Sequence, residues 1–143
     1  MAGEGIITDG EYPDQRRTSS FIIDLASSVQ KQVLAHHDKR WVIDAISVVT
    51  MDTGATSTLR FYATPLGQDV QGTPGDANHP YITNAIDCDA ITGATSTATA
   101  QADCTIVTTE NKLAEGTQLC VEKTGTPAGK TATVVVRWRE RLS

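Results

Sequence analysis

Apolar residues recur at every second position in several short segments of this sequence, and turns containing glycine or proline separate those segments. A repeat of two is the spacing of a β-strand, in which successive side chains point to opposite faces. The longest such segment is residues 41–50, where we expect the odd-numbered residues to face one way and the even-numbered residues the other. Strands are predicted over residues 19–26, 29–34, 41–50, 59–63, 81–86, 105–109, 118–123 and 131–139.

About eight short strands with turns between them are typical of an all-β sandwich or barrel. Valine, isoleucine and threonine supply the strands, and a length of 143 residues suits one domain with its own core. No alternating helical pattern suggests a parallel sheet, although residues 27–34 could also form a helical turn or two. We therefore predict a single antiparallel β-sandwich of jelly-roll or Greek-key type.

The segments between the strands are expected to be loops. Residues 64–80 contain three prolines and three glycines and predict a long loop without buried periodicity. Residues 124–129 are predicted to form a hairpin loop between the last two strands. The hexapeptide Thr-Gly-Ala-Thr-Ser-Thr occurs at residues 53–58 and again at 92–97, but the flanking residues differ. We interpret these copies as two similar turns rather than as a duplicated repeat unit.

The overall charge argues against several classes of protein. A net charge of −5 disfavours a nucleic-acid-binding protein, because phosphate contacts need a basic surface. No apolar run is long enough to span a membrane, and the first ten residues lack the apolar stretch of a secretory signal. Three cysteines without a Cys-x-x-Cys pair fit synthesis in a reducing cytosol, although one disulfide is geometrically feasible.

A search for catalytic and metal-binding motifs gives little. None of the common nucleophile, phosphate-loop, zinc-protease or dinucleotide motifs occurs. Cys88 and Cys104 have acidic neighbours in the sequence, which would raise rather than lower a thiol pKa. His36 and His37 are adjacent and would point opposite ways in an extended chain, and the segment after Asp87 lacks the spacing of a calcium loop. We expect no enzyme activity and no cofactor.

Carbohydrate binding would require exposed aromatic rings. Trp41 and Trp138 lie on strongly apolar strands, so we expect both to pack in the core. Tyr12, Tyr62 and Tyr81 are scattered along the sequence.

Two features are candidates for binding a partner. Residues 1–17 are rich in glycine and acidic residues and predict an extended N-terminal arm ahead of a domain over residues 18–143. A frayed terminus is the alternative. The last strand has valines and a tryptophan on one face and a ladder of arginines on the other, which is either a solvated face or a contact stripe for an acidic partner. The candidate partner-binding residues are Ile6, Ile7, Tyr12, Arg16, Arg17, Arg137, Arg139 and Arg141.

The strand-and-turn pattern of residues 29–139 resembles the small β-sandwich domains of tailed-bacteriophage virion proteins. The resemblance is carried by residues 39–49, by the turn and strand at 111–121, by the Thr124-Gly125-Thr126 turn and by the closing strand at 134–139. Capsid decoration proteins, also called cement proteins, of jelly-roll fold are among these domains.

The resemblance implies a non-catalytic virion structural protein, assembled in the host cytoplasm, that sits on the capsid exterior and bridges major capsid subunits. It implies association with the phage major capsid protein and with further copies of itself, most plausibly as a trimer, without nucleic acid or membrane. The alternative is a head-fibre or tail-associated domain that binds host-surface glycans.

Overall fold

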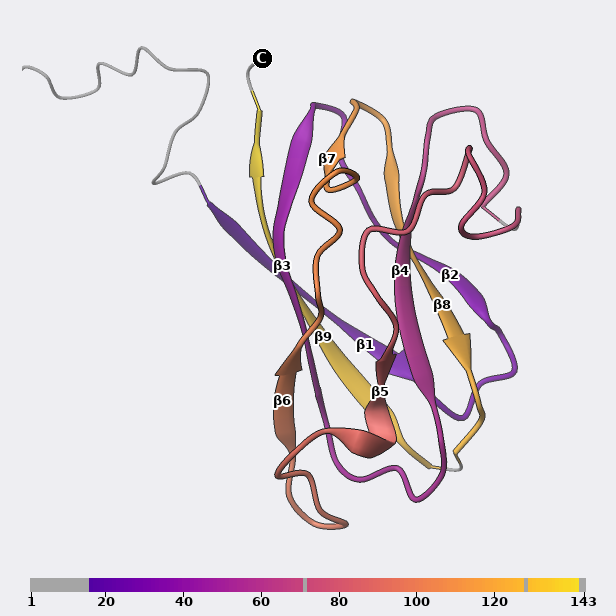
Figure 1. Ribbon diagram of the computed structural model, residues 1–143, viewed down its shortest axis with the longest axis vertical. Coiled ribbons are helices and arrows are strands. Elements are labelled where there is room, and N and C mark those ends of the chain that lie inside the picture. The colour runs from indigo at the N-terminus through magenta and orange to yellow at the C-terminus, as the bar shows by residue number, and fades with distance from the viewer. Residues whose placement is uncertain (1–15, 71, 128, 142–143) are drawn as a thin grey trace, which may run out of the picture.

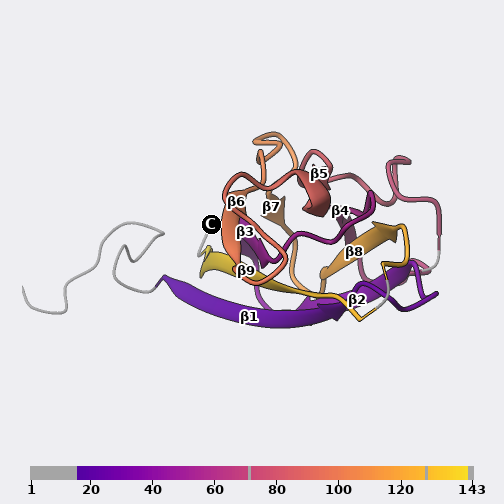
Figure 2. The same ribbon diagram turned by 90° about the horizontal axis from the view of Figure 1, so that it is seen from below.

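The computed structural model describes residues 16–70, 72–127 and 129–141, which form two antiparallel β-sheets packed face to face (Figures 1 and 2). A short 3-10 helix, η2, covers Cys88–Ala90. The strands are β1 (Arg17–Asp24), β2 (Lys31–His36), β3 (Trp41–Thr50), β4 (Thr58–Thr64), β5 (Ile86–Asp87), β6 (Ala100–Asp103), β7 (Lys112–Leu113), β8 (Gln118–Thr124) and β9 (Thr131–Glu140). The predicted all-β antiparallel sandwich is confirmed.

Strands distant in the sequence are neighbours in both sheets. The first, here called sheet A, has the order β1-β9-β3-β6, and β7 pairs with the start of β3. The second, sheet B, has the order β2-β8-β4-β5. In the described part of the chain, β1 and β2 are therefore edge strands, and no described helix is long and apolar enough to cross a membrane.

The core lies between the sheets and is mainly aliphatic. Its fully buried side chains include Ile23 and Leu25 from the N-terminal region and Phe61 and Leu119 from sheet B. These residues alternate with outward-facing positions along their strands, as the spacing in the sequence predicts.

The face assignment within β3 was wrong. Trp41 and Ile43 point into the core, but so do Ile46 and Val48, which strict alternation places on the opposite face. The register against β9 shifts between Ile43 and Ala45, so one extra residue, Asp44, interrupts the alternation. Such a bulge reverses the face on which later side chains lie.

The loop after β8 is not a hairpin, contrary to the prediction. β8 pairs with β2 and β4 in sheet B, whereas β9 pairs with β1 and β3 in sheet A. The chain therefore crosses from one sheet to the other at residues 125–130. Gly125 has a φ of +79°, and a Cβ there would lie 2.3 Å from the Thr56 carbonyl oxygen. Glycine is required because the crossing passes so close to the neighbouring backbone.

Several short strands also differ from the prediction. Residues 81–86 and 105–109 form only isolated bridges, Tyr62–Tyr81 and Thr83–Ile106, together with the first residue of β5. β6 and β7 arise instead in segments predicted to be polar or turn-like, where β3 offers an unpaired edge. β2 is a strand rather than a helical turn. Pairing with a longer strand overrides weak local preference.

The described chain begins close to the predicted arm boundary. Arg16 precedes β1, and Arg17 is already paired with Trp138 in sheet A. The rest of the predicted arm, including Ile6, Ile7 and Tyr12, lies outside the described residues.

Candidate interaction surface

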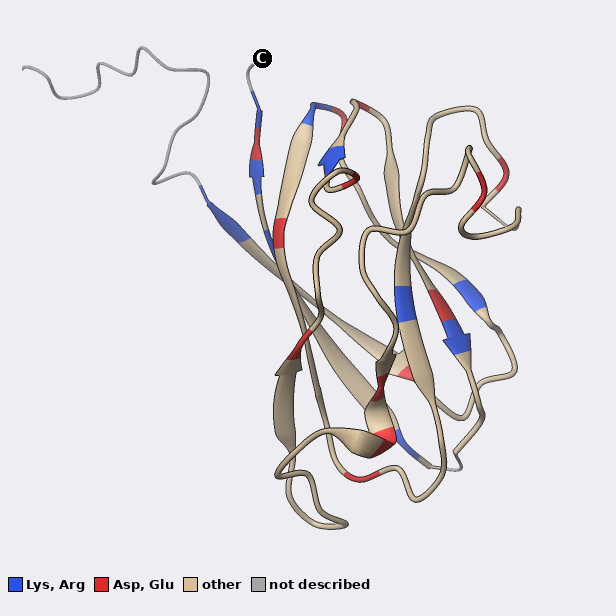
Figure 3. Cartoon of the chain, in the orientation of Figure 1, with Lys and Arg blue, Asp and Glu red and all other residues tan. Residues whose placement is uncertain are grey.

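Basic residues gather at one end of sheet A (Figure 3). The pairings that place them there join the start of β1 to the end of β9, and the start of β3 to the end of β9 and to β7. This basic end comprises eight of the twelve lysines and arginines in the sequence: Arg16, Arg17, Lys39, Arg40, Lys112, Arg137, Arg139 and Arg141.

The arginines of β9 are not equivalent. The Arg139 Nε donates to both carboxylate oxygens of Asp44, at 3.2 and 3.3 Å, so this side chain is engaged within its own sheet. Burial raises the pKa of Asp44, and the charge of Arg16 opposes that shift. Arg141 is half-buried, and its backbone N–H donates to the Arg40 carbonyl. Arg137 is exposed on the outer side of sheet A.

Of the five described candidates, the structure brings all to the basic end. Arg16, Arg17 and Arg137 are all exposed, and Arg137 is the one that lies within the sheet, between Thr18 of β1 and Ala45 of β3, beside the outer face. The arginines of the last strand therefore do not act as one set. Arg139 forms an ion pair with Asp44 at the β3 bulge, whereas Arg137 does not take part in that pair.

The two tryptophans belong to the packing of this end. Trp41 is 1% exposed, and its ring meets those of Trp138 and His37 edge-on, at centroid distances of 5.5 and 5.9 Å. The Trp138 Nε1 donates to Ser19 Oγ at 3.1 Å, and the His37 Nε2 lies 3.2 Å from Glu140 Oε1. The expected core packing is confirmed for Trp41, while Trp138 packs against the core and is partly exposed.

The outer face of sheet A, here called the open face, is largely uncharged. Across it, Ile22 of β1 lies opposite Thr133 of β9, which lies opposite Val49 of β3. Ile22 is 72% exposed, and a hollow lined by Val49, Met51 and Thr133 continues the surface toward the end of β3. Exposed Ile22 and the partly exposed hollow beside it, next to an exposed arginine, provide apolar and charged contacts of the kind found in protein interfaces.

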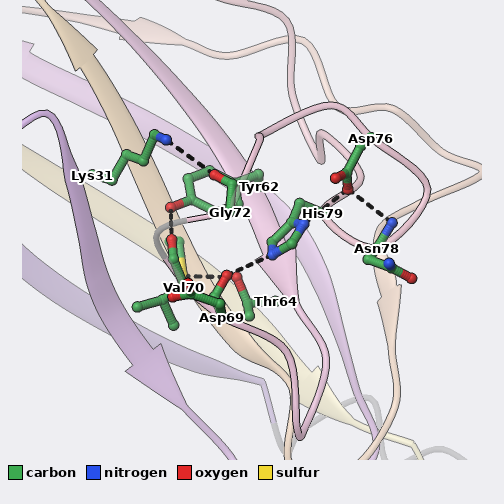
Figure 4. A network of polar contacts seen from close by, with 10 residues as sticks. Lys31, Tyr62, Thr64, Asp69, Val70, Gly72, Asp76, Asn78 and His79 are labelled. Atoms are coloured by element: carbon green, nitrogen blue, oxygen red, sulfur yellow. Dashed lines mark hydrogen bonds and ion pairs between the residues drawn. The ribbon is translucent and has the colours of Figure 1, made fainter.

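Part of the outer face of sheet B, over β4 and β8, is covered by the chain itself (Figure 4). Residues 65–70 and 72–80, here called the strap, lie over the outward-facing side chains of β4 and β8. Tyr62, Thr64 and Cys120 are consequently fully buried although they point away from the core. Burial is also the main reason that the pKa of Tyr62 is raised.

Polar contacts join the strap to β4, to the edge strand β2 and to itself. Tyr62 donates its hydroxyl proton to the Val70 carbonyl at 2.8 Å, and Lys31 of β2 donates to the Gly72 carbonyl at 3.0 Å. His79 is 4% exposed; its Nδ1 lies 2.8 Å from Asp76 Oδ1 and its Nε2 lies 2.6 Å from the Asp69 carbonyl oxygen.

The sequence reasoning missed this network because it treated residues 64–80 as a featureless loop. The spacing of Asp76 and His79, three residues apart beside a proline, is the signal that could have indicated a locally bonded histidine.

Burial dominates the chemistry of the cysteines. Cys88, Cys104 and Cys120 are free and buried. Desolvation raises the pKa of Cys88 and of Cys104 to about 12, and the charges of Asp87 and Asp103 add to these shifts. Acidic neighbours thus act in the predicted direction, but burial is the larger cause.

The other sequence candidates for metal binding are occupied by local contacts. Asp87 caps η2, since its Oδ1 accepts from the Asp89 N–H at 3.0 Å, and Asp89 also contacts Thr53 Oγ1 at 3.3 Å. The two copies of the repeated hexapeptide are both turns, with a hydrogen bond from the Asp52 N–H to the Thr95 carbonyl between them. Within residues 16–70, 72–127 and 129–141, no group of three or more His, Cys, Asp or Glu side chains could hold a metal ion.

No family model matches this chain, and neither does any curated protein. Among solved structures, it is similar to a chain described as "Cyanophage Pam1 capsid asymmetric unit". The two are 11% identical with a TM-score of 0.49, and the alignment covers 98% of this chain and 96% of that chain.

Proposed function

We propose that this chain is a non-catalytic structural protein of a phage virion, which decorates the capsid and stabilises it by bridging major capsid subunits. The class of particle comes from the resemblance of residues 29–139 to phage virion sandwiches. The observation that supports the binding role is the difference in coverage between the outer faces of the two sheets. The strap covers part of the outer face of sheet B, whereas the middle of the open face of sheet A, around Ile22, Thr133 and Val49, is uncharged, at least partly exposed and bordered by the basic end.

The charges indicate what kind of surface would be recognised. Arg137 stands at the junction of the open face and the basic end, where its guanidinium can pair with a carboxylate in two-point fashion. We therefore infer a partner surface that is apolar in the middle and acidic at one side. On a capsid, such a surface would belong to the major capsid protein or to a further copy of this chain.

The N-terminal segment supplies a second contact in this proposal. Residues 1–15 contain four acidic residues and no basic one, and they precede an edge strand. Ile6 and Ile7, followed by a threonine, could add a strand to the sheet edge of a neighbouring subunit, with Tyr12 as a further apolar anchor. Arg16 and Arg17 would pin the segment where it leaves the domain.

Among the described residues, the aromatic rings of Trp41, Tyr62 and Tyr81 give the glycan-binding alternative no support. Trp41 and Tyr62 are fully buried, and Tyr81 is half-buried with its ring stacked under the Arg60 guanidinium at 3.6 Å. Tyr81 also donates to Glu122 at 2.7 Å. These rings hold the fold together rather than form a stacking platform.

The test is to measure binding of the purified chain to particles from which it has been stripped. We expect Arg137→Glu to weaken binding about tenfold or more, because a like charge opposite an acidic surface is strongly unfavourable. The matched control is Gln32→Glu, which places the same acid on an exposed position of β2 in sheet B and should leave binding within about twofold. Absence of the chain from purified virions would contradict the proposed function, and equal binding of both variants would contradict the proposed surface.

A further inference from the structure

Both ring nitrogens of His79 face oxygen atoms that act as acceptors. The Asp69 carbonyl oxygen, 2.6 Å from Nε2, can only accept, and it already accepts from the Gly72 N–H at 2.9 Å. The Asp76 carboxylate, 2.8 Å from Nδ1, has its pKa lowered, chiefly by the hydrogen bond to His79, and is therefore ionised at neutral pH. A neutral imidazole has one nitrogen without a proton, whose lone pair would face an oxygen lone pair. Only the imidazolium satisfies both contacts.

We propose that the strap is a proton-dependent latch: doubly protonated His79 ties Asp69 to Asp76 and so holds the strap across sheet B, and loss of one proton loosens it. The latch is independent of the proposed virion role, since it rests on contacts within one chain.

His79 is the central hydrogen-bonding residue of the strap because its ring joins the segment before Gly72 to the segment after it. Asp69 lies before and Asp76 lies after the Gly72 carbonyl to which Lys31 donates. The backbone adds a ring of bonds around the histidine, from His79 N–H to the Asp76 carbonyl at 3.1 Å and from Gly75 N–H to the His79 carbonyl at 2.7 Å. Without the imidazolium, these two bonds would still close the turn at residues 75–79, but the bond from the His79 ring to the Asp69 carbonyl would be lost.

The groups that face His79 set the direction of the pH effect. Burial lowers the pKa of His79, but the hydrogen bonds that the ring donates to Asp76 and to the Asp69 carbonyl, together with the charges of both aspartates, outweigh burial, and the net pKa is raised. On β4 the ring faces Tyr62 at a centroid distance of 6.4 Å. Beyond Tyr62 lie Glu122 and Cys120 of β8, and Lys31 approaches from β2.

The sign of the pH dependence follows from the pKa of His79, which is higher in the folded protein than in the unfolded chain. The latch contributes fully to the stability of the closed strap at a pH below the ordinary histidine pKa of about 6.5. This contribution is lost as the pH rises through the raised pKa of His79. Tyr62 does not titrate in this window because its own pKa is raised further, so its bond to Val70 persists. We therefore assign opening of the strap at rising pH to deprotonation of His79.

Cys120 is a built-in reporter, since it lies on the outer side of β8 under the strap and is 0% exposed. We expect His79→Gln to increase the rate of Cys120 alkylation about tenfold at neutral pH, as determined by mass spectrometry of the intact variant. His36→Gln, at an exposed position of β2, is the matched control and should leave the rate unchanged. In the native chain, nitrogen NMR of the His79 ring should show both nitrogens protonated at neutral pH.

A second variant separates the latch from a general loss of stability. A Cβ on Gly72 would lie 2.4 Å from His79 Cε1 and 2.6 Å from Nε2, so Gly72→Ala should displace the ring and expose Cys120 without removing any titratable group. Cys88 and Cys104, in the core, should remain protected in the same samples.

Three results would overturn the proposal: a neutral His79 ring at pH 6, Cys120 protection unchanged in both variants, or native Cys120 exposure that does not follow the His79 titration. If His79→Gln exposes all three cysteines together, the native titration decides the matter, because it requires no substitution.

Discussion

Lys123 is a buried cation at the point where the chain crosses between the sheets. It is 2% exposed, and its ammonium group donates to the Leu25 carbonyl at 3.2 Å and to the Gly125 carbonyl at 2.7 Å. These bonds link the end of β1, the crossing loop and β8. A residue that looks like a solvated surface lysine in the sequence therefore has a structural role in the interior.

We expect Lys123→Met to lower the free energy of unfolding by about 2 kcal/mol, because the buried Leu25 carbonyl and the part-buried Gly125 carbonyl lose their donor. Lys123→Ala should cost more, since it also leaves a cavity. Urea unfolding measures both, with the exposed Lys112→Met as the control. Equal stability of Lys123→Met and the parent chain would show that burying the ammonium costs as much as its two hydrogen bonds contribute.

The three cysteines are expected to contribute packing only. Replacing Cys88, Cys104 and Cys120 with alanine should cost a few kcal/mol in total, about the loss expected for small buried groups, and should leave particle binding intact. Thermal melting and the particle-binding assay provide the two measurements. Loss of binding in a single variant that keeps its stability would reveal a role for that thiol.

At the scale of elements, β1 is the boundary between the N-terminal segment and the sandwich. Removing residues 1–15 leaves every described strand intact, so we expect a melting temperature within about 3 °C of the full chain together with weaker attachment to particles. Removing residues 1–24 should destabilise the fold by several kcal/mol, because it deletes buried Ile23 and uncovers the edge of β9.

The two truncations check one another. Circular dichroism melting and occupancy on stripped particles are measured for both. Unchanged occupancy after removal of residues 1–15 would contradict the arm hypothesis, while a collapsed melting temperature for that same truncation would assign the segment to the core.

The elements also show which patterns could be predicted. The bounds of β3 were predicted correctly, because a run of ten mostly apolar residues between two turns leaves little ambiguity about a strand, although the bulge at Asp44 made the face assignment wrong. β4, β8 and β9 each differ from the prediction by only one or two residues in all. β6 and β7 were missed because small or polar residues carry no strand signal until a partner such as β3 supplies the hydrogen bonds.

At the scale of the whole molecule, we expect the chain to form a closed homo-oligomer, namely a trimer. The basis is the resemblance to cement proteins and the general preference of homo-oligomers for closed symmetry. Light scattering over a range of concentrations gives the mass. A monomer at high concentration, together with isolated single copies on the capsid, would contradict this prediction.

The sequence by itself determined the class of fold and the position of the longer strands, since alternation and turn residues are local signals. It also marked the arginines of the last strand as unusual, although not which of them is available to a partner. The tertiary structure decided that point through the β3 bulge, which brings Asp44 to Arg139 and leaves Arg137 exposed.

The tertiary structure likewise decided the crossing after β8, the burial of Lys123 and the latch at His79. Each depends on contacts between segments far apart in the chain or on the backbone path of a loop. A carbonyl oxygen is present in every residue, so only the folded path shows which carbonyls face a lysine or a histidine.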